Sequence, residues 1–267
     1  MYKLVAIDMD GTLLQKDHTI SPRTKKAIQK ARQQDVKIVL ASGRPLEGMQ
    51  SYLEELDITS SEDYVLSYNG AIVQNIKTKE VIKRKVLKGK DLHYLYSLSR
   101  ELGVNIHAFS KDGCITPKMS TYSKLEGTMS EIPVHIIDYS TISDDEEIIK
   151  VMMVDEPEIV AHAIKNLPKE VHERYTVVQS APYFLEFLNK GANKGEGVRL
   201  LTEHLGIKAE EVMCIGDAGN DIHMIEFAGL GIAMDNAFEE VKKVADYITK
   251  SNNEDGVAKA IEKFVVA

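Results

Sequence analysis

The chain opens with short apolar runs that alternate with amphipathic stretches. Residues 3–7 (KLVAI) and 37–42 (KIVLAS) are almost continuously apolar, which predicts two buried strands. Ser21-Pro22 places an N-cap residue before a proline at the first helical position, so a helix is expected between these strands. A second helix is expected over residues 45–56. Strands that alternate with helices predict right-handed crossovers and a parallel sheet covered on both faces.

Residues 64–75 (YVLSYNGAIVQN) interrupt this alternation. Asn69-Gly70 stands there between two strand-like runs, which is a strong signal for a β-hairpin. We therefore interpret Asn69 first as a turn residue.

The pattern changes twice more along the chain. From about residue 83 it becomes a mixed set of short strands with two helices, which is typical of an α+β unit. The alternation returns with a helix that begins near Lys194. The prediction is an α/β core domain of residues 1–82 plus 188–267, with an α+β domain of residues 83–187 inserted into it.

The composition narrows the function classes. The chain has 267 residues, 43% of them hydrophobic, and a formal net charge of −8, which argues against a binder of nucleic acid or anionic membranes. Cys114 and Cys214 are far apart in sequence, form no disulfide framework and suit a reducing cytosol. No signal-peptide pattern and no apolar run of membrane-spanning length is visible, so we expect a cytoplasmic protein. The sequence leaves open whether it is a monomer or a homodimer.

Polar side chains stand where four of the predicted elements begin or end. Asp8 and Asp10 close the first strand, and Ser42-Gly43-Arg44 closes the second. Lys194 stands where the final alternating segment begins, and the segment GDAGND (216–221) follows a late strand. In open α/β sheets, ligands bind at the edge formed by the carboxyl ends of the strands. We therefore expect the four segments to converge on one site.

The residue types in these segments point to phosphate and a hard metal ion. Residues two apart on an extended chain face the same side, so Asp8 and Asp10 can face one site. Burying them together with Asp217 is costly unless a cation compensates their charge. Oxygen ligands with few histidines suit Mg²⁺, which prefers sites shared with substrate phosphate, and Lys194 adds a point charge for an anion. The expected chemistry is phosphoryl transfer on a small phosphorylated metabolite.

These four segments resemble the ordered motifs of the haloacid dehalogenase superfamily. The resemblance covers the whole chain. The insert between the second and third motifs is similar to the C2-type cap of the Cof-like branch, and the stretches IKVMMVDEP, SAPYFLE and MDNA resemble its bacterial sugar-phosphatase group. The resemblance implies a Rossmann-like parallel-sheet core, with a cap that closes over the site and selects the leaving group.

The resemblance also implies a role for each motif residue. Asp8 would attack phosphorus and become an aspartyl phosphate, and Asp10 would protonate the leaving alcohol and then activate water. Mg²⁺ would be held by the Asp8 carboxylate, the Asp10 backbone carbonyl and Asp217, with Asp221 supporting the ion from its outer shell. The phosphoryl oxygens would be bound by the N–H groups of Met9 and Gly43 together with Ser42, Lys194 and Asn220.

Several interpretations stay open at this point. Arg44 either binds substrate or ties down its own loop, and the resemblance places the turn residue Asn69 near the substrate. The function expected first is an Mg²⁺-dependent phosphatase of sugar phosphates, with flavin mononucleotide and pyridoxal phosphate as other phosphomonoesters to consider. A phosphomutase that uses the same intermediate and a phosphate-binding signalling module are the alternatives.

Overall fold

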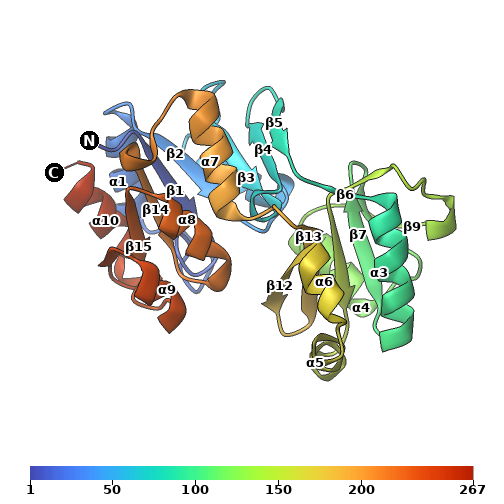
Figure 1. The fold of residues 1–267 in the computed structure, drawn as a ribbon. Helices are drawn as coiled ribbons and strands as arrows, with labels where there is room; N and C mark the ends of the chain where they lie inside the picture. The colour runs from blue at the N-terminus through green and yellow to red at the C-terminus, as the bar shows by residue number, and fades with distance from the viewer. Residues whose placement is uncertain (267) are drawn as a thin grey trace. The chain divides into compact units, whose positions relative to one another are not determined.

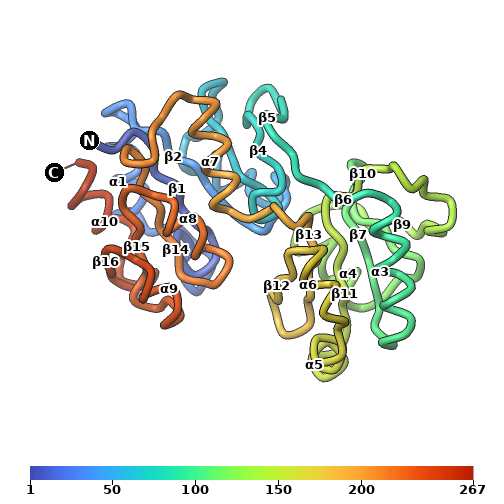
Figure 2. Tube along the Cα trace, viewed as in Figure 1, coloured from blue at the N-terminus to red at the C-terminus, as the bar shows by residue number. Residues whose placement is uncertain are grey.

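The computed structural model describes residues 1–266, which form two compact units (Figure 1). The core unit consists of Met1–Arg84 and Asn193–Ala267, and the insert unit consists of Lys85–Ala192. The chain leaves the core unit once and re-enters it once (Figure 2). Among the described residues, no helix combines the length and apolarity needed to cross a membrane.

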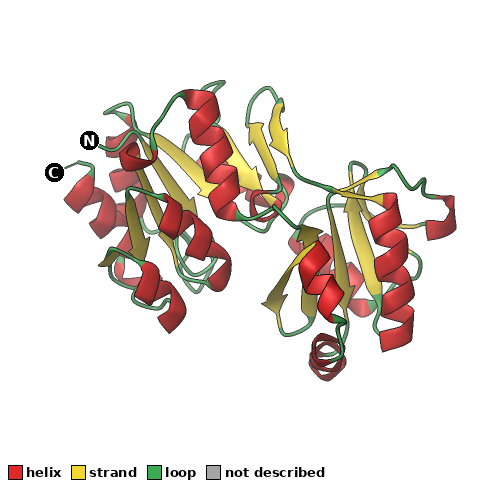
Figure 3. Ribbon diagram, viewed as in Figure 1, coloured by secondary structure: helices red, strands yellow, loops and turns green. Residues whose placement is uncertain are grey.

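The core unit is built on an eight-stranded sheet with the strand order β16-β15-β14-β1-β2-β3-β4-β5 (Figure 3). The strands from β16 to β3 are parallel, whereas β4 and β5 are antiparallel to their neighbours. The predicted α/β core is confirmed, and so is the hairpin, which pairs β3 with β4. The bounds are β1 Leu4–Asp8, β2 Lys37–Ala41, β3 Tyr64–Ser67, β4 Ile72–Asn75, β5 Val81–Arg84, β14 Val212–Gly216, β15 Leu230–Ala233 and β16 Tyr247–Ile248.

Helices cover both faces of this sheet, which explains why the central strands β1 and β14 are buried at every position. Val5 of β1 belongs to the apolar cluster that includes residues of α1 and α10. Its neighbour Leu4 belongs to a second cluster with Val198 of α7, which crosses in front of the sheet in Figure 1. The helices of the core unit are α1 Pro22–Arg32, α2 Gln50–Glu55, α7 Lys194–Leu205, α8 Ile222–Phe227, α9 Glu239–Val244 and α10 Gly256–Phe264. The predicted helix over 45–56 is shorter, because residues 47–49 form a 3₁₀ turn before α2 begins.

The insert unit is an α+β unit, as predicted. Its six-stranded sheet has the order β12-β13-β11-β7-β8-β9, in which only β8 and β9 are parallel, and β6 and β10 form a separate pair. The strands are β6 Leu87–Lys88, β7 Ile106–Ser110, β8 Gly113–Thr116, β9 Val134–Ile136, β10 Glu147–Ile148, β11 Lys150–Val154, β12 Tyr175–Ala181 and β13 Phe184–Asn189. The helices are α3 Gly89–Leu102, α4 Thr121–Met129, α5 Pro157–Lys165 and α6 Lys169–Arg174.

The limits of the two units differ from the boundaries drawn from the sequence. The boundary after residue 187 falls inside β13, whose ladder with β12 runs on to Asn189 within the insert unit. The boundary after residue 82 falls inside β5, which belongs to the core sheet. The basic run around residue 84 is therefore an edge strand in part, and the insert begins only at Lys85.

Helix α7 approaches α8 through a glycine next to Lys194. A Cβ atom on Gly195 would clash with the backbone carbonyl of His223 in α8. Glycine at this position therefore allows the two helices to come into contact directly after Lys194.

We expect Gly195→Ala to separate α7 from α8 and to lower the free energy of unfolding by about 1–3 kcal/mol, because the added methyl group meets backbone atoms. Urea unfolding of the core unit measures this loss. Gly219→Ala is the matched control, since a Cβ atom there meets only the Glu240 carboxylate, at 3.7 Å. Equal stability of the two variants would contradict the proposed contact.

Candidate active site

Three strands bring their carboxyl ends to one edge of the core sheet. Asp8 is the last residue of β1, Ser42 directly follows β2, and Asp217 directly follows β14. Strand β1 pairs in parallel with both β2 and β14, and Asp8 is the register partner of Ala41. Parallel pairing places these three residues at the edge where ligands bind in such sheets.

A buried lysine connects two of the acids. Lys194, the first residue of α7, has no exposed surface, and its Nζ donates to Asp8 Oδ1 at 2.5 Å and to Asp221 Oδ1 at 2.7 Å. Burial alone lowers the pKa of Lys194, but the charges of Asp221 and Asp8 outweigh it and raise this pKa above its ordinary value. The ammonium therefore stays charged and holds the two carboxylates in place.

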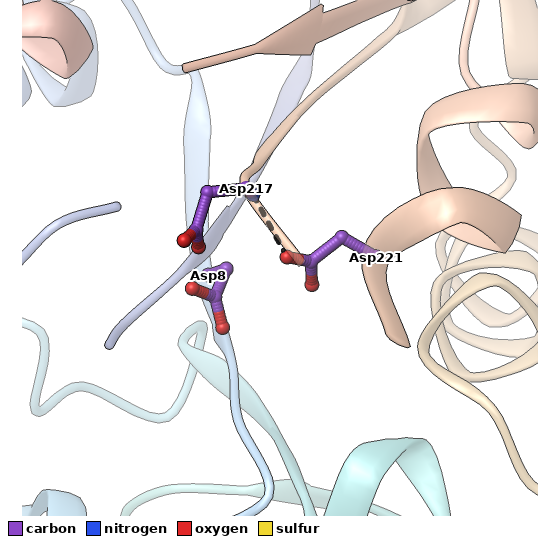
Figure 4. Close-up of side chains that lie close together, drawn as sticks. All are labelled: Asp8, Asp217 and Asp221. Carbon is purple, nitrogen blue, oxygen red and sulfur yellow. Dashed lines mark hydrogen bonds between the residues drawn. The ribbon is translucent and has the colours of Figure 1, made fainter. Parts of the chain in front are cut away.

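The carboxylates of Asp8, Asp217 and Asp221 form a compact cluster (Figure 4). One oxygen from each lies within 4.8 Å of the others. Asp221 Oδ2 accepts hydrogen bonds from the backbone N–H groups of Asp217 and Ala218, and Asp217 Oδ1 accepts one from the Thr12 hydroxyl. Asp8 Oδ2 is buried and has no hydrogen-bond partner among residues 1–266.

The cluster carries more negative charge than Lys194 neutralises. Burial and then the charge of Asp221 raise the pKa of Asp8 well above its ordinary range, and the same two causes raise the pKa of Asp217 to about 6. Both shifts arise because three close carboxylates are buried beside a single ammonium group. An all-oxygen donor set with one unpartnered buried oxygen fits a hard divalent metal ion.

Asp10 points to a different partner. Its carboxylate is no member of the cluster, and its side chain is 50% exposed. Asp10 Oδ1 accepts from Arg44 Nη2 at 2.6 Å, and Asp10 Oδ2 accepts from Arg44 Nε at 3.0 Å. The structure thus pairs two of the predicted site residues with each other.

The remaining predicted ligands gather around Asn69. The Asn69 backbone N–H donates to the Ser42 carbonyl at 2.8 Å, and its side-chain Oδ1 accepts from Asn220 Nδ2 at 2.9 Å. A Cβ atom on Gly43 would lie 3.2 Å from the Asn69 amide nitrogen. Asn69 is therefore the turn residue of the hairpin and also links two of the four segments, the one after β2 and the one after β14.

The turn that carries Asn69 is strained. Tyr68 and Asn69 have φ angles of 52° and 56°, in the left-handed region that costs a non-glycine residue about 1 kcal/mol. The two residues are buried, so tertiary packing maintains this conformation. Met9, by contrast, has its side chain fully buried in the core cluster, which leaves only its backbone for a ligand.

Two polar residues near the site have roles that the sequence patterns do not predict. Thr12 bonds Asp217, and Asn236 Nδ2 donates to the Gly11 carbonyl at 2.8 Å while its Oδ1 accepts from the Asn252 backbone. The signal for Thr12 was its place beside the two acids, whereas nothing local marks Asn236 as a partner of Gly11. Gly11 itself has φ +86°, and a Cβ atom there would clash with the Asp217 carboxylate.

Comparison with known proteins relates the chain to a family of hydrolases. Residues 5–261 match the family model of the haloacid dehalogenase-like hydrolases. The chain is 47% identical to the putative phosphatase YxeH of Bacillus subtilis over the full length of both proteins. It is 34% identical to 5-amino-6-(5-phospho-D-ribitylamino)uracil phosphatase YcsE of the same organism, over 99% of this chain and 96% of that protein.

Solved structures show the same fold. A haloacid dehalogenase-like hydrolase from Bacteroides thetaiotaomicron superposes with a TM-score of 0.87 and 34% identity, covering 98% of this chain and 99% of that one. The subclass IIB sugar phosphatase BT4131 superposes with a TM-score of 0.82 and 27% identity, covering 99% and 100%. Both similarities extend over the core and insert units alike.

The raised pKa of Asp217 predicts a pH-dependent stability in EDTA. The folded protein binds a proton at Asp217 up to about pH 6, whereas the unfolded chain releases it near the ordinary value of 3.8. The stability should therefore fall as the pH rises from about 4 to about 6 and should level off at higher pH. Asp217→Asn should flatten this fall, measured as the thermal unfolding midpoint at each pH. An unchanged slope in the variant would show that other groups cause the dependence.

Proposed function

Because the chain belongs to the haloacid dehalogenase-like hydrolase family, we propose that it is an Mg²⁺-dependent phosphatase of small phosphomonoesters that acts through an aspartyl-phosphate intermediate. The observation that carries the proposal is the state of Asp8. Its Oδ1 is fixed by Lys194, and its Oδ2 is buried with no hydrogen-bond partner in the described part of the chain. A carboxylate oxygen held in this way is available to a metal ion or to phosphorus. The phosphatases among the relatives support this reading.

The metal would be held by the carboxylates of Asp8 and Asp217 and by the Asp10 backbone carbonyl. Asp221 would support the site from outside, because its two oxygens already accept hydrogen bonds from Lys194 and from two backbone N–H groups. When bound, Mg²⁺ neutralises charge on the nucleophile and on the phosphoryl oxygens. The protein requires this ion because the cluster carries more negative charge than Lys194 neutralises.

The reaction proceeds in two displacements. An Asp8 carboxylate oxygen forms a bond to phosphorus as the bond from phosphorus to the leaving oxygen breaks, and Asp10 gives that oxygen a proton. Asp10 then takes a proton from a water molecule, whose oxygen attacks the aspartyl phosphate. The second displacement releases inorganic phosphate and restores the Asp8 carboxylate.

The phosphoryl oxygens are bound by groups at the same sheet edge. Lys194 supplies a positive charge next to Asp8, and the Ser42 side chain together with the N–H groups of Met9 and Gly43 supplies neutral donors. Asn220 is the further donor, and its bond to Asn69 orients it. Asn69 therefore supports phosphate binding indirectly, through its hydrogen bond with Asn220.

We assign sugar phosphates as the substrate class and the insert unit as the part that selects among them. The support comes from the similarity to the sugar phosphatase BT4131 and to the ribitylaminouracil phosphatase YcsE. The net charge of −8 disfavours nucleic acid as a partner. Two free, buried cysteines fit a cytosolic location.

We expect phosphate release from sugar phosphates with Mg²⁺, and none in EDTA. Asp8→Asn should abolish release, because the amide cannot replace the attacking carboxylate. Inorganic phosphate is measured over a panel of sugar phosphates, flavin mononucleotide, pyridoxal phosphate and p-nitrophenyl phosphate. Asp35→Asn is the matched control, because Asp35 is exposed and has a left-handed φ that asparagine adopts readily. Full activity of Asp8→Asn would overturn the assignment of the nucleophile.

The identity of the products separates a phosphatase from a phosphomutase. With glucose 6-phosphate we expect glucose and inorganic phosphate in equal amounts, and a phosphorylated Asp8 after rapid acid quenching. Glucose 1-phosphate without free phosphate would identify a mutase. A phosphorylated protein that persists for minutes without turnover would identify a signalling module.

A further inference from the structure

Arg44 and Asp10 form a fork-shaped ion pair at the edge of the site. Two adjacent nitrogen atoms of the guanidinium, Nη2 and Nε, meet the two carboxylate oxygens at 2.6 and 3.0 Å. The pair joins the segment after β1 to the segment after β2, across 34 residues of sequence. Two parallel charge-assisted hydrogen bonds fix the plane of the carboxylate as well as its distance.

Arg44 is itself held by several groups. Its Nη1 donates to the Gly48 carbonyl at 3.3 Å, and its guanidinium carbon lies 5.7 Å from the centre of the Tyr52 ring. Its backbone N–H donates to the Ser42 hydroxyl at 3.2 Å, and its carbonyl accepts from Tyr68. The side chain is 24% exposed, against 50% for Asp10. Arg44 is therefore held in position by its other contacts, and it orients the Asp10 carboxylate.

We infer that Arg44 is the residue that positions the Asp10 carboxylate, and that its main role is not the binding of the phosphoryl group. The inference rests on the proposed function, in which Asp10 serves the leaving oxygen. The inference is based on the hydrogen bonds of the guanidinium. Its Nε and Nη2 atoms could bind two phosphate oxygens in one plane, but both already donate to Asp10. The sequence leaves open whether Arg44 binds substrate or anchors its own loop, and the geometry points to a third role.

This role has a consequence that depends on the leaving group. When the bond from phosphorus to an alkyl oxygen breaks, the departing alkoxide needs a proton. The protonated form of Asp10 carries that proton on one carboxyl oxygen, while its other oxygen still accepts from Arg44. A p-nitrophenolate ion departs without a proton, because its charge is spread over the ring. A residue that places Asp10 therefore matters for alkyl phosphates and matters little for p-nitrophenyl phosphate, whereas a phosphate ligand matters equally for both.

The test compares kcat/KM for glucose 6-phosphate and p-nitrophenyl phosphate in wild type, Asp10→Asn, Arg44→Met and the double variant. This quantity includes only steps up to the first departure of the alcohol. We expect Asp10→Asn to lower kcat/KM for glucose 6-phosphate about 100-fold or more, the usual range for general acid catalysis. Arg44→Met should lower the ratio of kcat/KM for glucose 6-phosphate to kcat/KM for p-nitrophenyl phosphate about tenfold. In the Asp10→Asn background, Arg44→Met should not lower kcat/KM for glucose 6-phosphate any further.

Arg23→Met is the matched control. Arg23 makes the same fork with Glu262, with Nε to Oε1 at 3.1 Å and Nη2 to Oε2 at 2.6 Å, between α1 and α10. Its loss removes an equivalent ion pair from the same unit, so both kinetic values should stay unchanged. Arg44→Lys keeps the charge and loses the fork, and it should fall between wild type and Arg44→Met. It also decides the question if Arg44→Met fails to fold.

Three outcomes would overturn the inference. Arg44→Met, or Arg44→Lys in its place, could lower both kinetic values equally, which would make Arg44 a phosphate ligand. The losses of Arg44→Met and Asp10→Asn could add, which would separate their roles. The ratio could also stay at its wild-type value. Failure of the proposed function is distinguishable from these, because wild type would then release no phosphate or Asp8→Asn would retain activity.

Discussion

The structure of the site depends on one buried interaction, the Lys194 ammonium between the carboxylates of Asp8 and Asp221. All three side chains are almost fully withdrawn from water, so each charge is tolerated only because the others are present. Removing the lysine would leave two buried carboxylates uncompensated, a change that typically costs about 3–5 kcal/mol. The position of the ammonium is in turn set by the start of α7 and by the contact of Gly195 with α8. Helix packing on one face of the sheet thus determines the electrostatics at its edge.

The same interaction leaves the site short of positive charge. Lys194 faces Asp8 and Asp221. Asp217 lies beside them and accepts a hydrogen bond from the Thr12 hydroxyl, which carries no charge. The raised pKa values of Asp8 and Asp217 express this imbalance. A folded chain that binds a divalent cation at this point gains back part of what burial costs. In the proposed mechanism, the excess negative charge that destabilises the cluster is also the cause of its affinity for a metal ion.

The sequence predicted the elements that local patterns determine, and it could not predict contacts that depend on tertiary placement. The apolar run ending at Asp8 and the alternation of strands with helices led to the parallel core. The spacing argument for Asp8 and Asp10 assumed an extended chain, but β1 ends at Asp8 and Gly11 turns the backbone with a positive φ. The pairing of Asp10 with Arg44 is a side-chain contact between two loops that no local pattern encodes. The end of the insert shows the same limit. The pattern places the strand YFLEFL in the insert, but it does not show that the ladder with β12 continues to Asn189.

The two catalytic aspartates of the proposed mechanism are close in sequence but differ strongly in burial. Asp8 is 5% exposed and bound to a fixed cation, which suits a nucleophile that must keep one orientation and exclude water until phosphorus is transferred. Asp10 is half exposed, and the Arg44 guanidinium fixes the plane of its carboxylate. This exposure suits a group that must exchange protons with an alcohol and then with water. Exchanging the two environments would defeat both roles, since a buried carboxylate cannot reach solvent and an exposed one is not protected from it. The fold therefore assigns the two roles through the different surroundings it gives the end of β1 and the turn that follows it.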